Sequence, residues 1–181
     1  MLLLILMAMT NNSDTPALQV FKFNQLQDNQ HMIVNDSVMG GRSDSEMAMQ
    51  NDAALYTGKV SLENNGGFAS VRMIWPFELA DTKDQPKVVR LNVKGDGKSY
   101  QLRLRTNRGF DGAAYSYQFD TIKDQQQTIY IPVDQFIPTF RGRVLRDMPK
   151  LKFSDVRQMG VLIADYQTGD FAIELHYITL Q

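Results

Sequence analysis

The chain has 181 residues, of which 43% are hydrophobic and 22% are charged, and its formal net charge is −1. This length suits one domain with a single core, and the composition argues against wholesale disorder. The near-neutral charge gives no indication of a nucleic-acid partner. The sequence has no cysteine, which excludes disulfides, thiolate metal sites and cysteine nucleophiles.

The chain opens with an apolar run, residues 1–9, followed by a polar stretch, residues 10–16. The run is shorter than the roughly 20 residues that a membrane-spanning helix needs. It is similar to the hydrophobic part of a secretory signal, but no basic residue precedes it and no clear cleavage site follows. We expect residues 1–16 to be an apolar N-terminal segment with a polar linker, and residues 17–181 to form a single β-sandwich domain.

These features favour a cytoplasmic location, with export to the periplasm if the apolar run is a signal peptide. No other segment has the length and apolar character of a transmembrane span.

Strand patterns dominate the body of the chain. Residues 55–62 and 68–75 flank a Gly-rich turn, residues 63–67, and residues 88–94 run into Gly95-Asp96-Gly97, so both places predict hairpins. Pro132 favours an edge or an end for its strand. The remaining predicted strands are residues 100–106, 115–119, 128–133, 160–165 and 171–178.

No segment has the pattern of a long amphipathic helix. Short helical turns are expected near residues 133–136 and 154–157, with Ser154 as a possible cap of the second. Eight or more short strands with Gly-rich turns predict an all-β sandwich or barrel, and we favour a two-sheet jelly-roll β-sandwich.

Residues 34–43, Val-Asn-Asp-Ser-Val-Met-Gly-Gly-Arg-Ser, hold the densest group of turn-forming residues. Gly40 and Gly41 can adopt positive φ or permit close approach of the backbone. One interpretation is a structural loop between strands. The other is a loop that shapes a site for a ligand or a partner, in which case Asn35, Asp36, Met39, Gly40 and Gly41 are the candidate residues.

Arg103 and Arg105 alternate with Leu102 and Leu104, so both arginines project from one face of a single strand. Two guanidiniums on one face can hold carboxylates, phosphates or sugar hydroxyls, although a solvent-exposed polar face explains the pattern equally well. The segment 138–143 is expected to be a loop whose Arg141 serves a recognition edge.

The search for catalytic motifs finds none. The two histidines, His31 and His176, lack the spacing of paired metal ligands. No Gly-x-Ser-x-Gly elbow, Walker loop or dinucleotide-binding fingerprint occurs. We therefore predict no catalytic residues, no metal site and no cofactor.

Residues 34–43 resemble the complex I intermediate-associated protein 30 family. Four further stretches agree in order and spacing with the family pattern: residues 64–72, 100–105, 131–143, and 160–164 followed by 171–175. The resemblance spans roughly residues 20–180. It implies a jelly-roll sandwich similar to the galactose-binding domains, and the apolar leader is more typical of a bacterial stand-alone member than of a mitochondrial precursor.

Well-known members of this family help to assemble respiratory complex I, the NADH:ubiquinone oxidoreductase. The resemblance therefore implies a non-catalytic, chaperone-like binding protein whose partners are proteins such as respiratory-complex subunits. One alternative is a carbohydrate-binding module, with Tyr115 and Tyr117 as a stacking platform for a glycan. Another is an enzyme of unidentified class. The expected binding residues are Asn35, Asp36, Met39, Gly40, Gly41, Arg103, Arg105 and Arg141.

Overall fold

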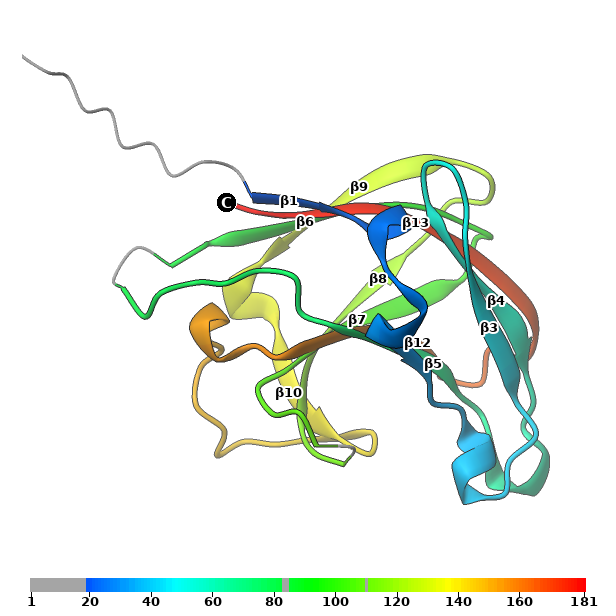
Figure 1. The fold of residues 1–181 in the computed structure, drawn as a ribbon. Coiled ribbons are helices and arrows are strands. Elements are labelled where there is room, and N and C mark those ends of the chain that lie inside the picture. Colours follow the sequence, from blue (N-terminus) through cyan, green and yellow to red (C-terminus); the bar gives the residue numbers. More distant parts are fainter. Residues whose placement is uncertain (1–18, 83–84, 110) are drawn as a thin grey trace, which may run out of the picture.

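The computed structural model describes residues 19–82, 85–109 and 111–181, and these form two β-sheets packed face to face (Figure 1). Every strand pair within the two sheets is antiparallel among the described residues. The predicted all-β sandwich is therefore confirmed, and the barrel alternative is wrong. Residues 1–16, predicted as an apolar segment and linker, lie outside the described residues.

The six-stranded sheet is built around the last strand, β13. Its order is β3 (Asp44–Met49), β4 (Ala54–Val60), β13 (Gly169–Leu180), β6 (Val88–Gly95) and β9 (Gln126–Pro132), and β1 (Gln19–Lys22) also pairs with β13. Pro132 ends the edge strand β9, where its missing N–H costs no ladder hydrogen bond.

The seven-stranded sheet carries the two predicted arginines on a central strand. Its order is β11 (Arg143–Val144), β10 (Ile137–Phe140), β8 (Ala114–Asp120), β7 (Ser99–Arg105), β12 (Gln158–Ile163), β5 (Ala69–Ile74) and β2 (His31–Ile33). The segment 138–143 is thus largely a strand pair and not the predicted loop.

Short 3-10 helices lie in the connections, and the described part of the chain contains no α-helix. They are η1 (Phe23–Gln25), η2 (Asp28–Gln30), η3 (Asp36–Met39), η4 (Glu63–Asn65), η5 (Val133–Gln135) and η6 (Phe153–Asp155). The helical turns predicted near residues 133 and 154 are present as η5 and η6. The predicted cap is wrong, because η6 begins after Lys152 and no side chain caps it.

The core lies between the sheets and follows from alternation along the strands. Tyr100, Leu102 and Leu104 of β7 are at most 1% exposed, and β12 contributes Met159, Val161 and Ile163 at 0%. Because successive side chains of a strand point to opposite faces, the residues between them lie on the outer face of the seven-stranded sheet.

The two predicted hairpins are wrong. β4 pairs with β3 and β13 in one sheet, whereas β5 pairs with β12 and β2 in the other. The turn after β4 therefore carries the chain across the sandwich, and Gly95-Asp96-Gly97 does the same between β6 and β7. A Gly-rich turn predicts a reversal of the chain, and such a reversal occurs in crossovers between sheets as well as in hairpins.

The part of the chain that the structure describes holds no helix with the length and apolar character needed to cross a bilayer.

Replacing Leu104 with alanine tests the core that the two sheets share. Leu104 is 0% exposed, so we expect Leu104→Ala to lower the free energy of unfolding by about 2–5 kcal/mol through lost burial and a residual cavity. Urea unfolding followed by tryptophan fluorescence measures this change. Ile122, which is 57% exposed, is the control, and Ile122→Ala should change stability by no more than about 0.5 kcal/mol. Equal effects of the two variants would contradict this assignment of the core.

Candidate functional site

The outer face of the seven-stranded sheet brings two arginines to either side of a glycine. Gly160 of β12 is directly opposite Arg72 of β5 on one side and Arg103 of β7 on the other. A Cβ atom at Gly160 would lie 2.6 Å from the carbonyl oxygen of Val71, so a larger residue does not fit without a backbone shift. The buried Gly160 thus allows β12 to lie close to the backbone of β5, between two strands that each carry an arginine.

Arg105 lies two residues further along β7, on the same face as Arg103, and is opposite Gln158 of β12. Although it points away from the core, Arg105 is only 5% exposed. Among the described residues, neither Arg103 nor Arg105 forms a side-chain ion pair, and the buried Nε atom of each has no hydrogen-bond partner. An unpartnered Nε atom in a buried or half-buried guanidinium is uncommon, because a buried charge is costly unless it is paired.

The electrostatics of this face are unfavourable for the arginines. Burial, followed by the positive charges of Arg72 and Arg103, lowers the pKa of Arg105 to about 9, while Asp111 acts in the opposite direction. Burial and the charge of Arg72 also lower the pKa of Arg103. Arg105 remains protonated at neutral pH, because a pKa of about 9 lies above 7. Arg103 and Arg105 are closely spaced cations that form no ion pair among the described residues.

Asp111 is the acidic residue whose negative charge acts on this face, and its carboxylate also pairs with Arg141. The guanidinium of Arg141 donates to Oδ2 of Asp111 at 2.8 Å, and both side chains are more than half exposed. The guanidinium carbon of Arg141 also lies 5.2 Å from the centre of the Phe140 ring, within the roughly 6 Å reach of a cation–π contact. Exposed pairs of this kind contribute little to stability. The structure thus links Arg141 to the strand arginines through Asp111.

Uncharged polar groups border the arginines. Gln158 donates through Nε2 to the carbonyl of Arg108 at 3.4 Å, while its buried Oε1 has no partner among the described residues. Ser116 of β8 is opposite Arg103, and its hydroxyl lies 2.9 Å from that of Thr139. This arrangement offers guanidinium donors beside amide and hydroxyl groups, which is the chemistry of a site for an oxygen-rich anion.

The predicted loop, residues 34–43, is held together by the carboxylate of Asp36. Asp36 is 1% exposed and accepts hydrogen bonds from Ser43 N at 2.9 Å, Ser43 Oγ at 2.5 Å, Gly67 N at 2.6 Å and Phe68 N at 3.2 Å. Burial alone would raise the pKa of Asp36, but these hydrogen bonds outweigh it and lower the pKa below its ordinary value of 3.8. The carboxylate therefore stays charged and fully engaged within the protein.

Some of the other residues of this loop make contacts within the protein, and others are exposed to solvent. Oδ1 of Asn35 accepts from Ser45 Oγ at 2.8 Å and from Ser70 N at 3.3 Å. A Cβ atom at Gly41 would lie 2.3 Å from Oδ1 of Asp36, so the glycine makes room for the carboxylate. Gly40 has φ of 91°, and Met39 is 63% exposed. These contacts give Asn35, Asp36 and Gly41 a structural role, and a binding role for the loop stays a prediction.

The structure does not join this loop to the arginines. The loop follows β2, at one edge of the seven-stranded sheet, whereas Arg103 and Arg105 lie on β7, with β12 and β5 between them (Figure 1). No hydrogen bond or ion pair connects the two groups within the described ranges. Tyr115 and Tyr117 do not form a surface platform, because Tyr115 is 3% exposed and Tyr117 packs against the core beside Phe136.

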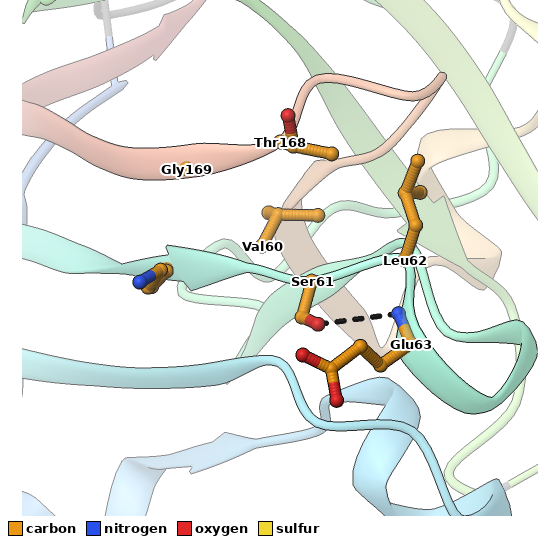
Figure 2. Close-up of a pocket in the computed structure, with 7 residues that line it drawn as sticks. Val60, Ser61, Leu62, Glu63, Thr168 and Gly169 are labelled. Carbon is orange, nitrogen blue, oxygen red and sulfur yellow. Dashed lines mark hydrogen bonds between the residues drawn. The ribbon is translucent and has the colours of Figure 1, made fainter.

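A shallow depression lies elsewhere, between the end of β4 and the start of β13 (Figure 2). Its lining residues are Lys59, Val60, Ser61, Leu62, Glu63, Thr168 and Gly169. The hydroxyl of Ser61 accepts from the backbone N–H of Glu63 at 3.2 Å, and the carboxylate of Glu63 pairs with Arg42 at 2.9 Å. Its polar groups thus largely satisfy one another, and the depression has no buried donor aimed into it among the described residues.

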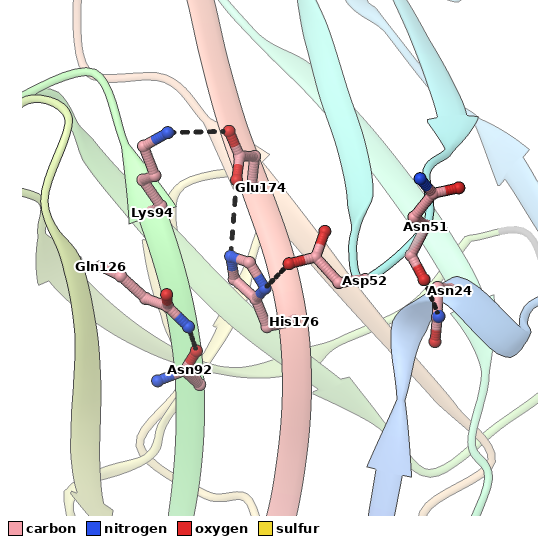
Figure 3. Close-up of polar contacts among 8 residues, drawn as sticks. All are labelled: Asn24, Asn51, Asp52, Asn92, Lys94, Gln126, Glu174 and His176. Carbon is pink, nitrogen blue, oxygen red and sulfur yellow. Dashed lines mark hydrogen bonds and ion pairs between the residues drawn. The ribbon is translucent and has the colours of Figure 1, made fainter.

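The outer face of the six-stranded sheet carries a network of charges (Figure 3). Glu174 accepts from Lys94 at 3.2 Å and lies 3.4 Å from Nε2 of His176, whose Nδ1 is 3.8 Å from Asp52. These opposite charges compensate one another, unlike the arginines of the other sheet. Over the described ranges, no group of three or more histidine, aspartate or glutamate side chains is arranged to hold a metal ion.

Sequence reasoning identified Arg103 and Arg105 but not Arg72. Arg72 alternates with Val71 and Met73, which are at most 2% exposed, and this pattern would have placed it on the outer face. The missing information was the strand order, since only the pairing of β5 and β7 with β12 brings the three arginines together.

The fold belongs to the class of two-sheet sandwiches found in carbohydrate-binding modules. The family 11 carbohydrate-binding module from Clostridium thermocellum, in complex with a β-1,3-1,4-mixed-linked tetrasaccharide, superposes with a TM-score of 0.62 at 13% identity, over 90% of this chain and 94% of that chain. An agarase matches with a TM-score of 0.56 at 10% identity, over 90% of this chain and 24% of that chain. At these identities the likeness shows the fold alone.

The family model of complex I intermediate-associated protein 30 (CIA30) matches residues 21–175. The chain belongs to this family, as the sequence resemblance indicated.

Two relatives illustrate how far the similarity extends. An uncharacterized protein of Schizosaccharomyces pombe is 26% identical over 170 residues, which cover 80% of this chain and 74% of that protein. The probable complex I intermediate-associated protein 30, mitochondrial, of Caenorhabditis elegans is 30% identical over 92 residues, which cover 49% of this chain and 27% of that protein. The match to the nematode protein therefore spans about a quarter of its length.

Replacing Asp36 with asparagine tests the loop. We expect Asp36→Asn to lower the free energy of unfolding by roughly 1–3 kcal/mol, because one of the two acceptor oxygens is lost and buried donors are left unpaired. Chemical denaturation measures the change. Asp44→Asn is the control, because Asp44 is exposed at the start of the neighbouring strand β3. A loss no larger than that of the control would mean that Asp36 does not hold the loop.

The lowered pKa of Asp36 also predicts how its contribution depends on pH. A carboxyl group whose pKa is lower in the folded state stabilises the fold above its ordinary pKa, here 3.8, and loses this contribution as the pH falls toward the folded-state value. The difference in unfolding free energy between wild type and Asp36→Asn should be constant above about pH 5 and shrink below it. Denaturation series from pH 7 to 3 measure this difference, and a difference independent of pH would contradict the assignment.

Proposed function

We propose that this chain is a non-catalytic binding protein that acts as an accessory factor in the assembly of a protein complex. Its binding surface is the outer face of the seven-stranded sheet around Arg103 and Arg105. The observation that carries the proposal is a pair of arginines on this face, Arg105 buried and Arg103 half-buried, whose Nε atoms have no hydrogen-bond partner among the described residues. A folded protein retains such a group at a cost in stability when a binding partner completes its contacts.

The partners of the buried carboxylate and of His176 among the described residues support a binding role. Asp36, the most deeply buried carboxylate described, is engaged by four hydrogen bonds. His176 lies between Asp52 and Glu174 on the opposite sheet, in a network of compensating charges away from the arginines. Neither group is placed beside Arg103 or Arg105, where a bound molecule would be held.

Membership of the CIA30 family supports the assembly part of the proposal. The nematode relatives are described as probable mitochondrial complex I intermediate-associated proteins. Because the match covers 27% of those proteins, assembly of respiratory complex I comes to this chain as a hypothesis. Met39 and Val38, at 63% and 59% exposed, offer a second apolar contact for a protein partner at the tip of the loop.

The carbohydrate-binding alternative has less support. Its expected stacking platform, Tyr115 and Tyr117, faces the core instead of the outer surface. The fold shared with carbohydrate-binding modules does not by itself carry their ligand. A neutral sugar would also leave the charges of Arg103 and Arg105 uncompensated.

Deleting the gene in its native organism tests the assembly role. We expect the level of fully assembled respiratory complex I, measured by native gel electrophoresis and NADH oxidation, to fall several-fold. Wild-type protein should restore the complex, and a variant carrying both Arg103→Met and Arg105→Met should restore it poorly despite normal abundance. Normal levels of the complex in the deletion strain would refute the assembly role.

A further inference from the structure

The arginine face brings three arginines from two strands to either side of a third strand. Arg72 and Arg103 flank Gly160, and Arg105 lies beside them at 5% exposure. The side chains of these residues come from three neighbouring strands, so the sheet itself fixes their spacing. Sites built on strands hold their geometry more tightly than sites on loops.

The charged residues on this face indicate what kind of group it would bind. Each of the three arginines adds positive charge, and Asp111 is the acid that acts on Arg72 and Arg105. Asp111 already pairs with Arg141 at 2.8 Å, and it is exposed to solvent that screens its charge. On the opposite sheet, by contrast, Lys94 has Glu174 as a direct partner. Among the described residues, Arg103 and Arg105 therefore lack the direct acidic partner that Lys94 has.

The geometry also limits the size of what can bind. Because Arg105 is almost fully buried, a broad charged surface cannot reach it, whereas a single compact group can. A guanidinium presents a planar pair of N–H donors that matches two oxygens of a carboxylate or phosphate.

From these observations we infer that the Arg103–Arg105 face is a binding site for a single oxyanionic group, a carboxylate or a phosphate. This inference rests on the proposed function, since it takes the same face as the binding surface, and it names the chemistry of the ligand. The bound oxyanion accepts from the guanidinium donors of Arg103 and Arg105. Ser116 and Gln158 border the site and can hydrogen-bond to the rest of the ligand.

Arg105→Met separates a binding role from a structural role, because the two roles predict opposite changes in the melting temperature of the ligand-free protein. Removing an uncompensated buried charge should raise the melting temperature of the ligand-free protein, by about 2–4 °C or more. The same change should abolish stabilisation by an oxyanion. If Arg105 instead stabilises the fold through contacts of its own, the melting temperature falls, and that result would overturn the inference.

The ligands are inorganic phosphate and glucuronate, with glucose as the neutral counterpart of glucuronate and all solutions at equal ionic strength. We expect phosphate, glucuronate or both to raise the melting temperature of the wild type and to bind with a measurable affinity by calorimetry. Binding to Arg105→Met should be weaker by roughly tenfold or more. A response to phosphate alone assigns a phosphate ligand, and a response to glucuronate alone assigns a carboxylate.

Arg90→Met is the matched control. Arg90 is also partly buried with an unpartnered Nε, but it lies on the six-stranded sheet, 5.1 Å from the ring of Tyr130. This variant should respond to the anions as the wild type does. Arg103→Met is a second test of the site and should also lose the response. The inference fails if no anion acts on the wild type, if glucose acts as strongly as glucuronate, or if Arg105→Met responds as the wild type does.

These outcomes are separate from those of the gene deletion. Binding of an oxyanion together with normal complex assembly would leave the site standing and remove the assembly role. Loss of assembly without any anion binding would do the reverse.

Discussion

The carboxylate of Asp36 joins the two sheets at one end of the sandwich. It accepts from Ser43, which precedes β3 of the six-stranded sheet, and from Gly67 and Phe68, which precede β5 of the seven-stranded sheet. Ser43 in turn accepts from the N–H of Ser61, just after β4. The chain changes sheets between these points, so this one buried anion ties the start of β5 to the start of β3. β5 in turn carries Arg72, which is opposite Gly160 of β12.

The two outer faces of the sandwich differ in the partners of their charged side chains. On the six-stranded sheet, Glu174 pairs with Lys94 and lies beside His176, while Arg90 lies over the ring of Tyr130. On the seven-stranded sheet, arginines lie beside one another, and burial lowers the pKa values of Arg103 and Arg105. The outer face of the six-stranded sheet thus contains a direct lysine–glutamate pair, whereas Arg103 and Arg105 form no ion pair among the described residues.

Sequence patterns predicted the strands with strong alternation and failed where information about pairing was needed. Tyr100, Leu102 and Leu104 identified β7 and placed Arg103 and Arg105 on its other face. β3 was missed because its segment, Asp-Ser-Glu-Met-Ala-Met, has weak β propensity and only half-buried inward positions. The hairpins were wrong because a Gly-rich turn does not specify which strand its neighbours will join. The burial of Arg105 and the hydrogen bonds to Asp36 depend on distant segments, which no local pattern reveals.

The placement of β13 has a consequence for how the chain folds. β13 pairs with β1, β4 and β6, so the central strand of the six-stranded sheet is the last one along the described chain. Val20 is paired with Thr179, so β1, the first described strand, can pair only after β13, the last one, is present. Such long-range pairing requires large loops to close before many contacts form, which is typical of folding on the millisecond-to-second scale. During synthesis, β1, β4 and β6 cannot pair with β13 until residues 169–180 have left the ribosome.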